Sequence, residues 1–167
     1  MTDSTEERDT TPARLRTLPT RVLSLVAMHS DRIVTDGLAG ADARKWHYAV
    51  LATLEENGPA SQAELSRRTG VYRSDLVSVI NELSARGLVE RAPDPADRRR
   101  NVITLTAAGR DRLRRLDGLL ASLADEVLAP LDAAERHQLT TLLTRLLDHH
   151  GGHPGHPGHP GHPGPGG

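Results

Sequence analysis

The sequence predicts a mainly α-helical protein with a small β-hairpin. Leucine, valine and isoleucine recur at spacings of three and four along several segments, which is the period of an amphipathic helix. Two short segments, 88–91 and 102–105, have the pattern of strands instead. With one Trp, two Tyr and no Phe, the core must be built from aliphatic side chains, as in a helix bundle. A length of 167 residues suffices for one domain with a sizeable core.

The chain opens with a predicted tail, followed by one long helix that ends near residues 37–40. Residues 1–12 are polar and charged without periodicity, which is typical of disorder. From Leu15 to Val34 apolar side chains recur at helical spacing, with Pro19 as a disturbance near the start. A stripe of this length exceeds what one small domain can cover, so it favours packing across the axis of a homodimer.

The next helix is expected over residues 41–57, with Asp42 as its N-terminal cap. Gly58 and Pro59 end it. Its main buried face is predicted to consist of His47, Val50, Leu51 and Leu54.

Two short helices joined by a tight turn follow. Ser61 has Glu64 three residues later, a pattern in which the two side chains cap the start of a helix. Gly70 breaks that helix, and the segment 72–86 forms the second. Such a helix-turn-helix places the N-terminal residues of its second helix in the DNA major groove. The core face of this second helix is predicted to be Leu76, Val79, Ile80 and Leu83.

A hairpin with a charged tip is predicted directly after these helices. Gly87 stops the second helix, and segments 88–91 and 102–105 are expected to pair. The loop 93–100 is rich in proline and charge, and is too long for a tight turn. Arginines on a projecting hairpin suit a narrow, electronegative minor groove, so the hairpin is interpreted as a wing.

Two leucine-striped helices are expected after the wing. The first is capped by Thr106 and broken at Pro130, and the second runs from Asp132 to about His149. Their stripes need partners, which favours an intertwined dimer interface. The predicted organisation is a helical dimerisation region over 13–40 and 107–149, a winged helix-turn-helix DNA-binding region over 41–106, and disordered tails over 1–12 and 150–167.

In these features the chain resembles the MarR family of winged helix-turn-helix transcriptional regulators. The resemblance covers roughly residues 14–149 in the order of the elements. Its most specific part is the wing pattern Asp-x-Arg-x5-Leu-Thr, formed by Asp97, Arg99, Leu105 and Thr106. The resemblance implies a homodimer that binds a pseudo-palindromic operator in double-stranded DNA, usually as a repressor released by a small, often phenolic, anion.

The expected DNA contacts lie on the second helix of the pair and on the wing. Many relatives carry Thr near the start of that helix and Arg three residues later, where this chain has Asp75 and Ser78, so their base preference cannot be transferred. For Arg99, the alternative to a DNA contact is an ion pair with Asp97 that only shapes the loop. The expected contacts are Arg73, Ser74, Asp75 and Ser78 on the helix, Arg98, Arg99 and Arg100 on the wing, and Ser61, Gln62 and Arg68 at phosphates.

A small-molecule effector is expected to bind between the helices of residues 14–40 and 41–57. Trp46, His47 and Tyr48 offer stacking surface and hydrogen-bonding groups to an aromatic anion. His29 and Arg32, three residues apart, offer positive charge. The alternatives are core and interface packing for the first three residues, and solvated helix surface for the other two.

Composition argues against several other kinds of site. The absence of cysteine excludes disulfides, thiolate zinc sites and a thiol-oxidation switch. No nucleophile–base pattern or glycine-rich phosphate loop is present, so neither an enzyme nor a cofactor is expected. No run approaches the ~18 apolar residues of a membrane helix, and the N-terminus does not resemble a signal peptide, so we expect a cytoplasmic protein. The net charge is −1, but arginine is concentrated at the wing.

Two alternatives remain open at this point. The four His-Pro-Gly units of the C-terminal tail are either inert or a loose ligand for Ni, Cu or Zn, and no defined metal site is expected. A rival function is a dimeric winged-helix module without an effector, acting on a protein partner or as a scaffold. Release from DNA by a small molecule would separate this module from a regulator.

Overall fold

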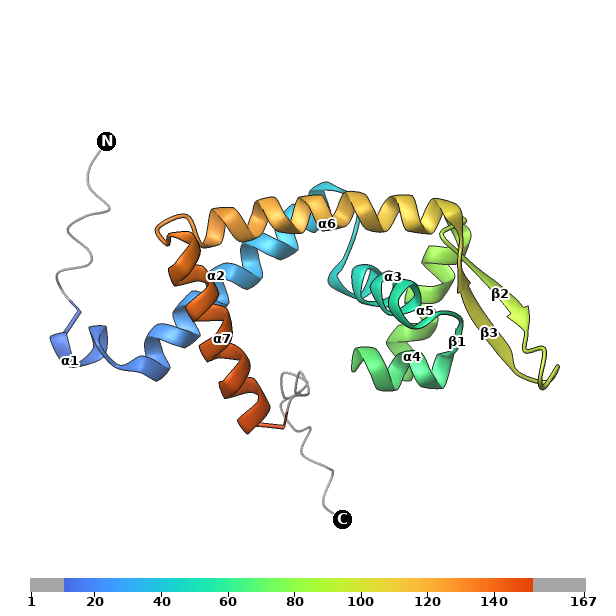
Figure 1. Cartoon of the computed structure of the whole chain (residues 1–167), viewed down its shortest axis with the longest axis horizontal. Helices are drawn as coiled ribbons and strands as arrows, with labels where there is room; N and C mark the ends of the chain where they lie inside the picture. The colour runs from blue at the N-terminus through green and yellow to red at the C-terminus, as the bar shows by residue number, and fades with distance from the viewer. Residues whose placement is uncertain (1–10, 152–167) are drawn as a thin grey trace, which may run out of the picture.

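The computed structural model describes residues 11–151 of the chain and confirms a mainly helical fold with a small β-wing (Figure 1). Apart from residues 11, 12, 150 and 151, the two predicted tails lie outside this range. The elements are α1 (Ala13–Arg16), α2 (Pro19–Gly40), α3 (Lys45–Asn57), β1 (Ala60–Ser61), α4 (Gln62–Thr69), α5 (Arg73–Ala85), β2 (Val89–Pro93), β3 (Asn101–Leu105), α6 (Ala107–Val127) and α7 (Ala133–His149).

The long helix α6 connects two parts of the molecule (Figure 1). At one end it packs against α3 and leads out of the β2–β3 hairpin, and along its other half it packs against α2. Helix α7 follows a turn after α6 and extends away from it, and none of the described side chains of α7 is buried. The helix-turn-helix and hairpin are therefore well separated from α1 and α7.

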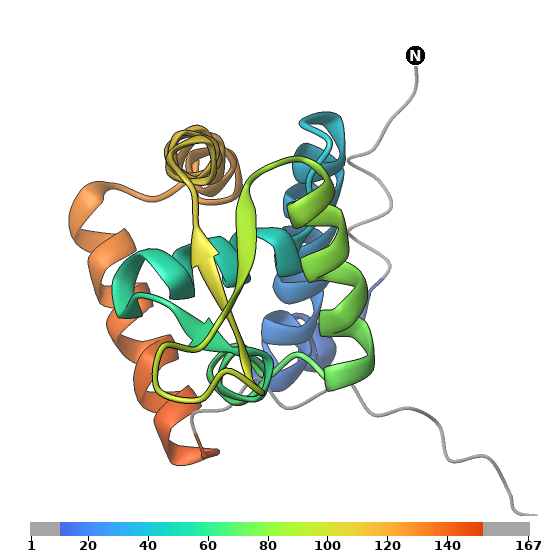
Figure 2. The ribbon, with the colours of Figure 1, turned by 90° about the vertical axis from the view of Figure 1, so that its right-hand side faces the viewer.

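The three strands form an antiparallel sheet in the order β1-β3-β2, which Figure 2 shows beneath α6 seen end-on. Ala60 of β1 pairs with Ile103, and Pro93 at the end of β2 pairs with Asn101. The hairpin strands are longer than predicted, and the loop shrinks to residues 94–100. Proline is tolerated at Pro93 because β2 is an edge strand, where a missing N–H breaks no ladder.

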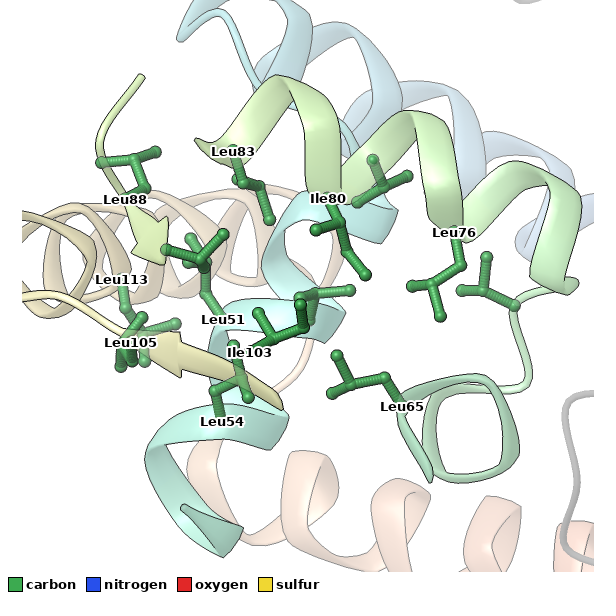
Figure 3. Packing of buried hydrophobic residues seen from close by; sticks show 14 of the residues in the cluster. Leu51, Leu54, Leu65, Leu76, Ile80, Leu83, Leu88, Ile103, Leu105 and Leu113 are labelled. Carbon is green, nitrogen blue, oxygen red and sulfur yellow. The ribbon is translucent and has the colours of Figure 1, made fainter. Parts of the chain in front are cut away.

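The core lies where α3, α4, α5, β3 and α6 meet (Figure 3). Leu51, Ile80 and Ile103 are fully buried at its centre and come from three different elements. The predicted buried faces of both helices are confirmed, because each of these residues is buried: His47, Val50, Leu51 and Leu54 on α3, and Leu76, Val79, Ile80 and Leu83 on α5.

The helix start predicted at residue 41 with an Asp42 cap is wrong. Asp42 has a left-handed φ of 53°, its N–H donates to Ala39 O, and the N–H of Ala43 donates to Leu38 O at 2.8 Å. This pairing ends α2 as a Schellman motif, with the buried side chains of Leu38 and Ala43 in the apolar positions that accompany it. Asp42 thus belongs to the end of one helix, and Arg44 is the N-cap of the next.

Proline sits at the first helical turn of α2, so the predicted disturbance at Pro19 is confirmed. Thr17 and Leu18 separate α1 from α2 there. The missing N–H of proline costs nothing at this position, because the first N–H groups of a helix have no intrahelical acceptor.

Two glycines of α6 allow a matched test of packing. A Cβ on Gly109 would lie 2.1 Å from Leu88 O, whereas a Cβ on Gly118 would meet nothing within 4 Å. We expect Gly109→Ala to destabilise the protein by about 1–3 kcal/mol through overpacking. Gly118→Ala should stabilise it by about 0.4–1 kcal/mol by restricting the unfolded chain. Urea unfolding at equal protein concentration measures both, and an unchanged midpoint for Gly109→Ala would contradict the close approach.

Candidate nucleic-acid interface

The first helix of the pair is capped as the sequence predicts. Ser61 Oγ accepts from the N–H of Glu64 at 3.3 Å, and Glu64 Oε2 accepts from the N–H of Ser61 at 2.8 Å. Glu64 Oε2 also accepts from Ser61 Oγ at 2.9 Å, and the two hydrogen bonds that Ser61 donates to this carboxylate lower the pKa of Glu64. Gly70 ends α4 with a left-handed φ of 71°. The confirmed capping box and glycine stop place α5 directly after a fixed turn.

Polar bonds inside the turn fix the direction in which α5 leaves α4. Ser66 Oγ donates to Val71 O at 2.6 Å, and Thr69 Oγ1 accepts from the N–H of Val71 at 3.3 Å. The side chain of Val71 is itself buried in the core. The turn is therefore held by apolar packing and by hydrogen bonds at the same residue.

Helix α5 divides into a buried face and an outward face. Tyr72, just before the helix, and the first three helical residues, Arg73, Ser74 and Asp75, are exposed, as are Val77 and Ser78. Among them are all four residues expected to contact DNA from this helix: Arg73, Ser74, Asp75 and Ser78. A carboxylate in the first turn, such as that of Asp75, also interacts favourably with the helix N-terminus.

The wing loop is shaped by its own aspartates. Asp94 Oδ1 accepts from the N–H of Ala96 at 2.9 Å, and Asp97 Oδ1 accepts from the N–H of Arg99 at 3.1 Å. Within residues 11–151 no ion pair joins the guanidinium of Arg99 to Asp97. Asp97 therefore shapes the loop through the backbone, and the side chains of Arg98, Arg99 and Arg100 are exposed.

One hollow brings four of the ten expected DNA contacts together. It lies between the start of α4, the start of α5 and the end of the wing loop, and is lined by Ser61, Gln62, Ala63, Arg73, Val77, Arg100 and Asn101. Arg98 and Arg99 lie further along the wing loop, and Arg68 is exposed near the opposite end of α4. The helix-turn-helix and the wing thus contribute cationic side chains to one continuous surface.

Sequence reasoning missed two ties between α5 and its surroundings. Arg91 of β2 donates to Asn81 Oδ1 at 2.5 Å, which connects the wing strand to α5. Glu82 accepts from Arg44 at 2.5 Å, from His47 Nε2 at 2.8 Å and from Ser78 Oγ at 3.2 Å. Glu82 therefore joins the start of α3 to α5. Helical spacing predicted the burial of His47, but no pattern connects it with a residue 35 positions away.

The hydrogen bonds of His47 define its tautomer and its charge. Its Nδ1 accepts from the N–H of Arg44 at 3.2 Å, so in the neutral ring Nε2 carries the proton donated to Glu82. The side chain is buried, and burial lowers the pKa of His47, outweighing the opposite effect of its hydrogen bond with Glu82. The hydrogen bond from His47 in turn lowers the pKa of Glu82.

The five residues expected to bind an effector have different surroundings within a single chain. His47 lines a hollow with Arg44, Glu82 and Arg86, whereas Arg32 lines another with Gly37 and Leu123. The remaining three have separate surroundings: Trp46 is partly exposed, Tyr48 donates to Asp117 Oδ1 at 2.9 Å with a consequently raised pKa, and His29 is exposed on α2.

Comparison with known proteins assigns the chain to a family. A model of the MarR family matches residues 37–100, which include the helix-turn-helix and most of the wing. The crystal structure of a probable transcriptional regulator from Pseudomonas aeruginosa is 30% identical, with a TM-score of 0.67 over 79% of this chain and 98% of that one. The chain belongs to the MarR family. The resemblance stated from the wing pattern is therefore confirmed, and the family is one of transcriptional regulators rather than enzymes.

Further relatives have described roles. The transcriptional repressor NicR of Pseudomonas putida is 33% identical over 101 residues, which are 60% of this chain and 64% of NicR, less than two thirds of its length. A mutant of E. coli MarR complexed with operator DNA is 25% identical, with a TM-score of 0.65 over 82% of this chain and 99% of that one. PcaV of Streptomyces coelicolor, in complex with its natural ligand, is 29% identical, with a TM-score of 0.66 over 83% and 98%.

Two further kinds of site are absent from the part of the chain that the structure describes. No three His, Cys, Asp or Glu side chains in residues 11–151 come together as metal ligands. The helices in this range also lack the combination of length and apolarity needed to cross a membrane. The His-Pro-Gly tail lies beyond it.

The lowered pKa of His47 predicts a specific pH dependence of stability. In the unfolded chain the imidazole has its ordinary pKa of 6.5, so as pH falls below this value the unfolded state takes up the proton first. The contribution of His47 to the free energy of unfolding is fully present above pH 6.5 and is lost on acidification. One proton changes this free energy by at most about 1.4 kcal/mol per pH unit.

We expect His47→Gln, which keeps a neutral N–H donor, to flatten the dependence between pH 7 and pH 5. His137→Gln, an exposed position on α7, is the control and should leave the dependence as in the wild type. Denaturant unfolding at several pH values measures it. An unchanged slope in His47→Gln would show that other groups cause the acid sensitivity.

Proposed function

We propose that this chain is a homodimeric repressor that binds a pseudo-palindromic operator and is released by a small aromatic anion. The observation that carries the proposal is the continuous exposed surface formed by the outward face of α5 and the arginine-bearing wing. The operator complex of MarR, which is similar over nearly its whole length, supports DNA as the partner. The alternative is an effector-independent winged module that binds another protein.

In this proposal α5 enters the major groove and the wing contacts the adjacent minor groove. Arg73 lies at the start of α5, where a guanidinium can reach a guanine edge or a phosphate. Ser74 and Ser78 are small enough to permit close approach of the helix. Arg98, Arg99 and Arg100 project from the wing towards phosphates of the narrow groove. Ser61, Gln62 and Arg68 contact the DNA backbone, and the carboxylate of Asp75 accepts from cytosine N4.

The second copy of the chain is proposed to cover the apolar side chains at the end opposite the wing. Exposed aliphatic side chains are concentrated on α1, α2 and α7, all away from the hairpin (Figure 1). A monomer rarely leaves so many together in water, and a two-fold axis would bury the same surface on both copies. The residues are Leu15, Leu18, Val22, Leu23, Leu25, Val26, Met28, Leu142, Leu143, Leu146 and Leu147.

A small aromatic anion is proposed as the effector, in line with the structure of PcaV with its natural ligand. The hollow at His47 contains two guanidinium groups, but Arg44 is paired with Glu82 and Arg86 with Asp42. An anion entering there would compete with these carboxylates. Residues His29, Arg32, Trp46 and Tyr48 would need the second copy to complete a shared site.

Selection of bound duplexes from a random-sequence library tests the proposed function. We expect a palindrome with half-sites about one helical turn apart, and an affinity that falls steeply with salt as phosphate-bound counterions are released. The selected operator then serves to screen small aromatic anions for release of the DNA. Recovery of no enriched sequence would contradict operator binding and favour the protein-binding module.

The dimer interface is tested by a charge on α7. Leu146→Glu should convert the dimer to monomers and abolish operator binding, because a carboxylate would be buried without a partner at the two-fold interface. Leu146 is 49% exposed in one chain, so the monomer fold should keep its helicity. Gln138→Glu places the same charge elsewhere on α7 and should remain dimeric. Sedimentation of Leu146→Glu as a dimer would refute this interface.

A further inference from the structure

An apolar side chain occupies the middle of the outward face of α5. Val77 is 44% exposed, whereas the nearby apolar residues Leu76 and Val79 are buried in the core. Arg73 lies four residues before it and Asn81 four residues after it, so the three form one row along the helix. Val77 is thus not needed for the core, and it is an aliphatic group among polar ones.

The position of Val77 is on the surface proposed to face DNA. It lines the hollow shared by Arg73 at the start of α5 and Arg100 at the end of the wing loop. The polar side chains beside it are held by other groups: Ser78 Oγ donates to Glu82, and Asn81 Oδ1 accepts from Arg91. These two hydrogen bonds hold the polar side chains that follow Val77 on the outward face of α5.

We propose that Val77 contacts the C5-methyl group of a thymine in the major groove and selects for that base in each half-site. The inference rests on the proposed function, in which α5 enters the major groove. Thymine alone among the four bases presents a methyl group there, and an apolar side chain is the complement to it. Val77 has no donor or acceptor, so it cannot replace the hydrogen bonds that water makes to the exocyclic amino group of cytosine or adenine.

The serine next to Val77 leaves room for this contact. A short side chain at Ser78 allows the helix to approach the base edges closely, and its bond to Glu82 directs its hydroxyl hydrogen back towards the protein. The oxygen of Ser78 can then only accept from a neighbouring base. Val77 and Ser78 would therefore recognise different features of the groove and can be separated by mutation.

Substitution of deoxyuridine for thymine tests the contact, because it removes only the methyl group and keeps base pairing. The full-length chain is titrated with its selected operator, in which each thymine of the half-site is replaced in turn. For the wild type we expect one position at which the replacement weakens binding by about three- to tenfold, as expected for losing one buried methyl group.

Two variants assign the effect to a side chain. Val77→Ala should bind the thymine operator more weakly, and should lose little or nothing further at the position sensitive to deoxyuridine. Ser78→Ala is the matched control and should keep the full deoxyuridine penalty. Thermal unfolding should show that Val77→Ala is as stable as the wild type, since Val77 is exposed.

Two outcomes would overturn the inference alone, with operator binding intact. One is a wild-type chain that is insensitive to deoxyuridine at every thymine of its operator. The other is a deoxyuridine penalty that is as large in Val77→Ala as in the wild type. Failure of the wild type to bind any duplex specifically would overturn the proposed function and this contact with it.

Discussion

The burial of α3 is the interaction on which the rest of the structure depends. Val50 and Leu51 are fully buried, and α3 packs against α4, α5, β3 and α6. Both helices of the helix-turn-helix, α4 and α5, and the wing strand β3 contact α3. The apolar face of α3 therefore sets their relative positions. The surface side chains of α5 and the wing are held in place by contacts on their opposite sides, where no DNA would reach.

Polar contacts then refine an arrangement that apolar packing determines only coarsely. Leucine and valine contacts permit small rotations of a helix, whereas hydrogen bonds require particular directions. Glu82 joins α5 to His47 and Arg44 at the start of α3, and Arg91 joins α5 to the wing strand. These contacts lie largely at the edge of the core, where the charged groups stay partly exposed to water. They therefore orient the exposed face of α5 without burying an unpaired charge.

Periodicity and caps predicted the helices, the turn at Gly70 and the hairpin with arginines on its loop. Each of these features depends on residues close together in sequence. Strand β1 could not be predicted, because two residues are too few to show the alternation of a strand. Ala60 is assigned to a strand only because it pairs with Ile103, which is distant in sequence. The cap assigned to Asp42 was wrong because the same residue type suits a helix start and a left-handed turn. Trp46, His47 and Tyr48 are adjacent in sequence, but successive helical residues point about 100° apart, and in one chain His47 bonds to Glu82 whereas Tyr48 bonds to Asp117. Their role in binding an effector stays a prediction.

The Schellman turn at the end of α2 has a mechanical consequence. The carbonyl oxygen of Asp42 accepts from Arg86, just after α5, at 2.7 Å and from Arg112 of α6 at 3.2 Å, and Arg112 also bonds to Ala41 O. The end of α5 and the start of α6 are thus both fastened to the α2–α3 junction, so α5 cannot swing about that junction without releasing Arg86. In the proposed dimer, the distance between the two α5 helices would be set by how α1, α2 and α7 of one copy pack against those of the other.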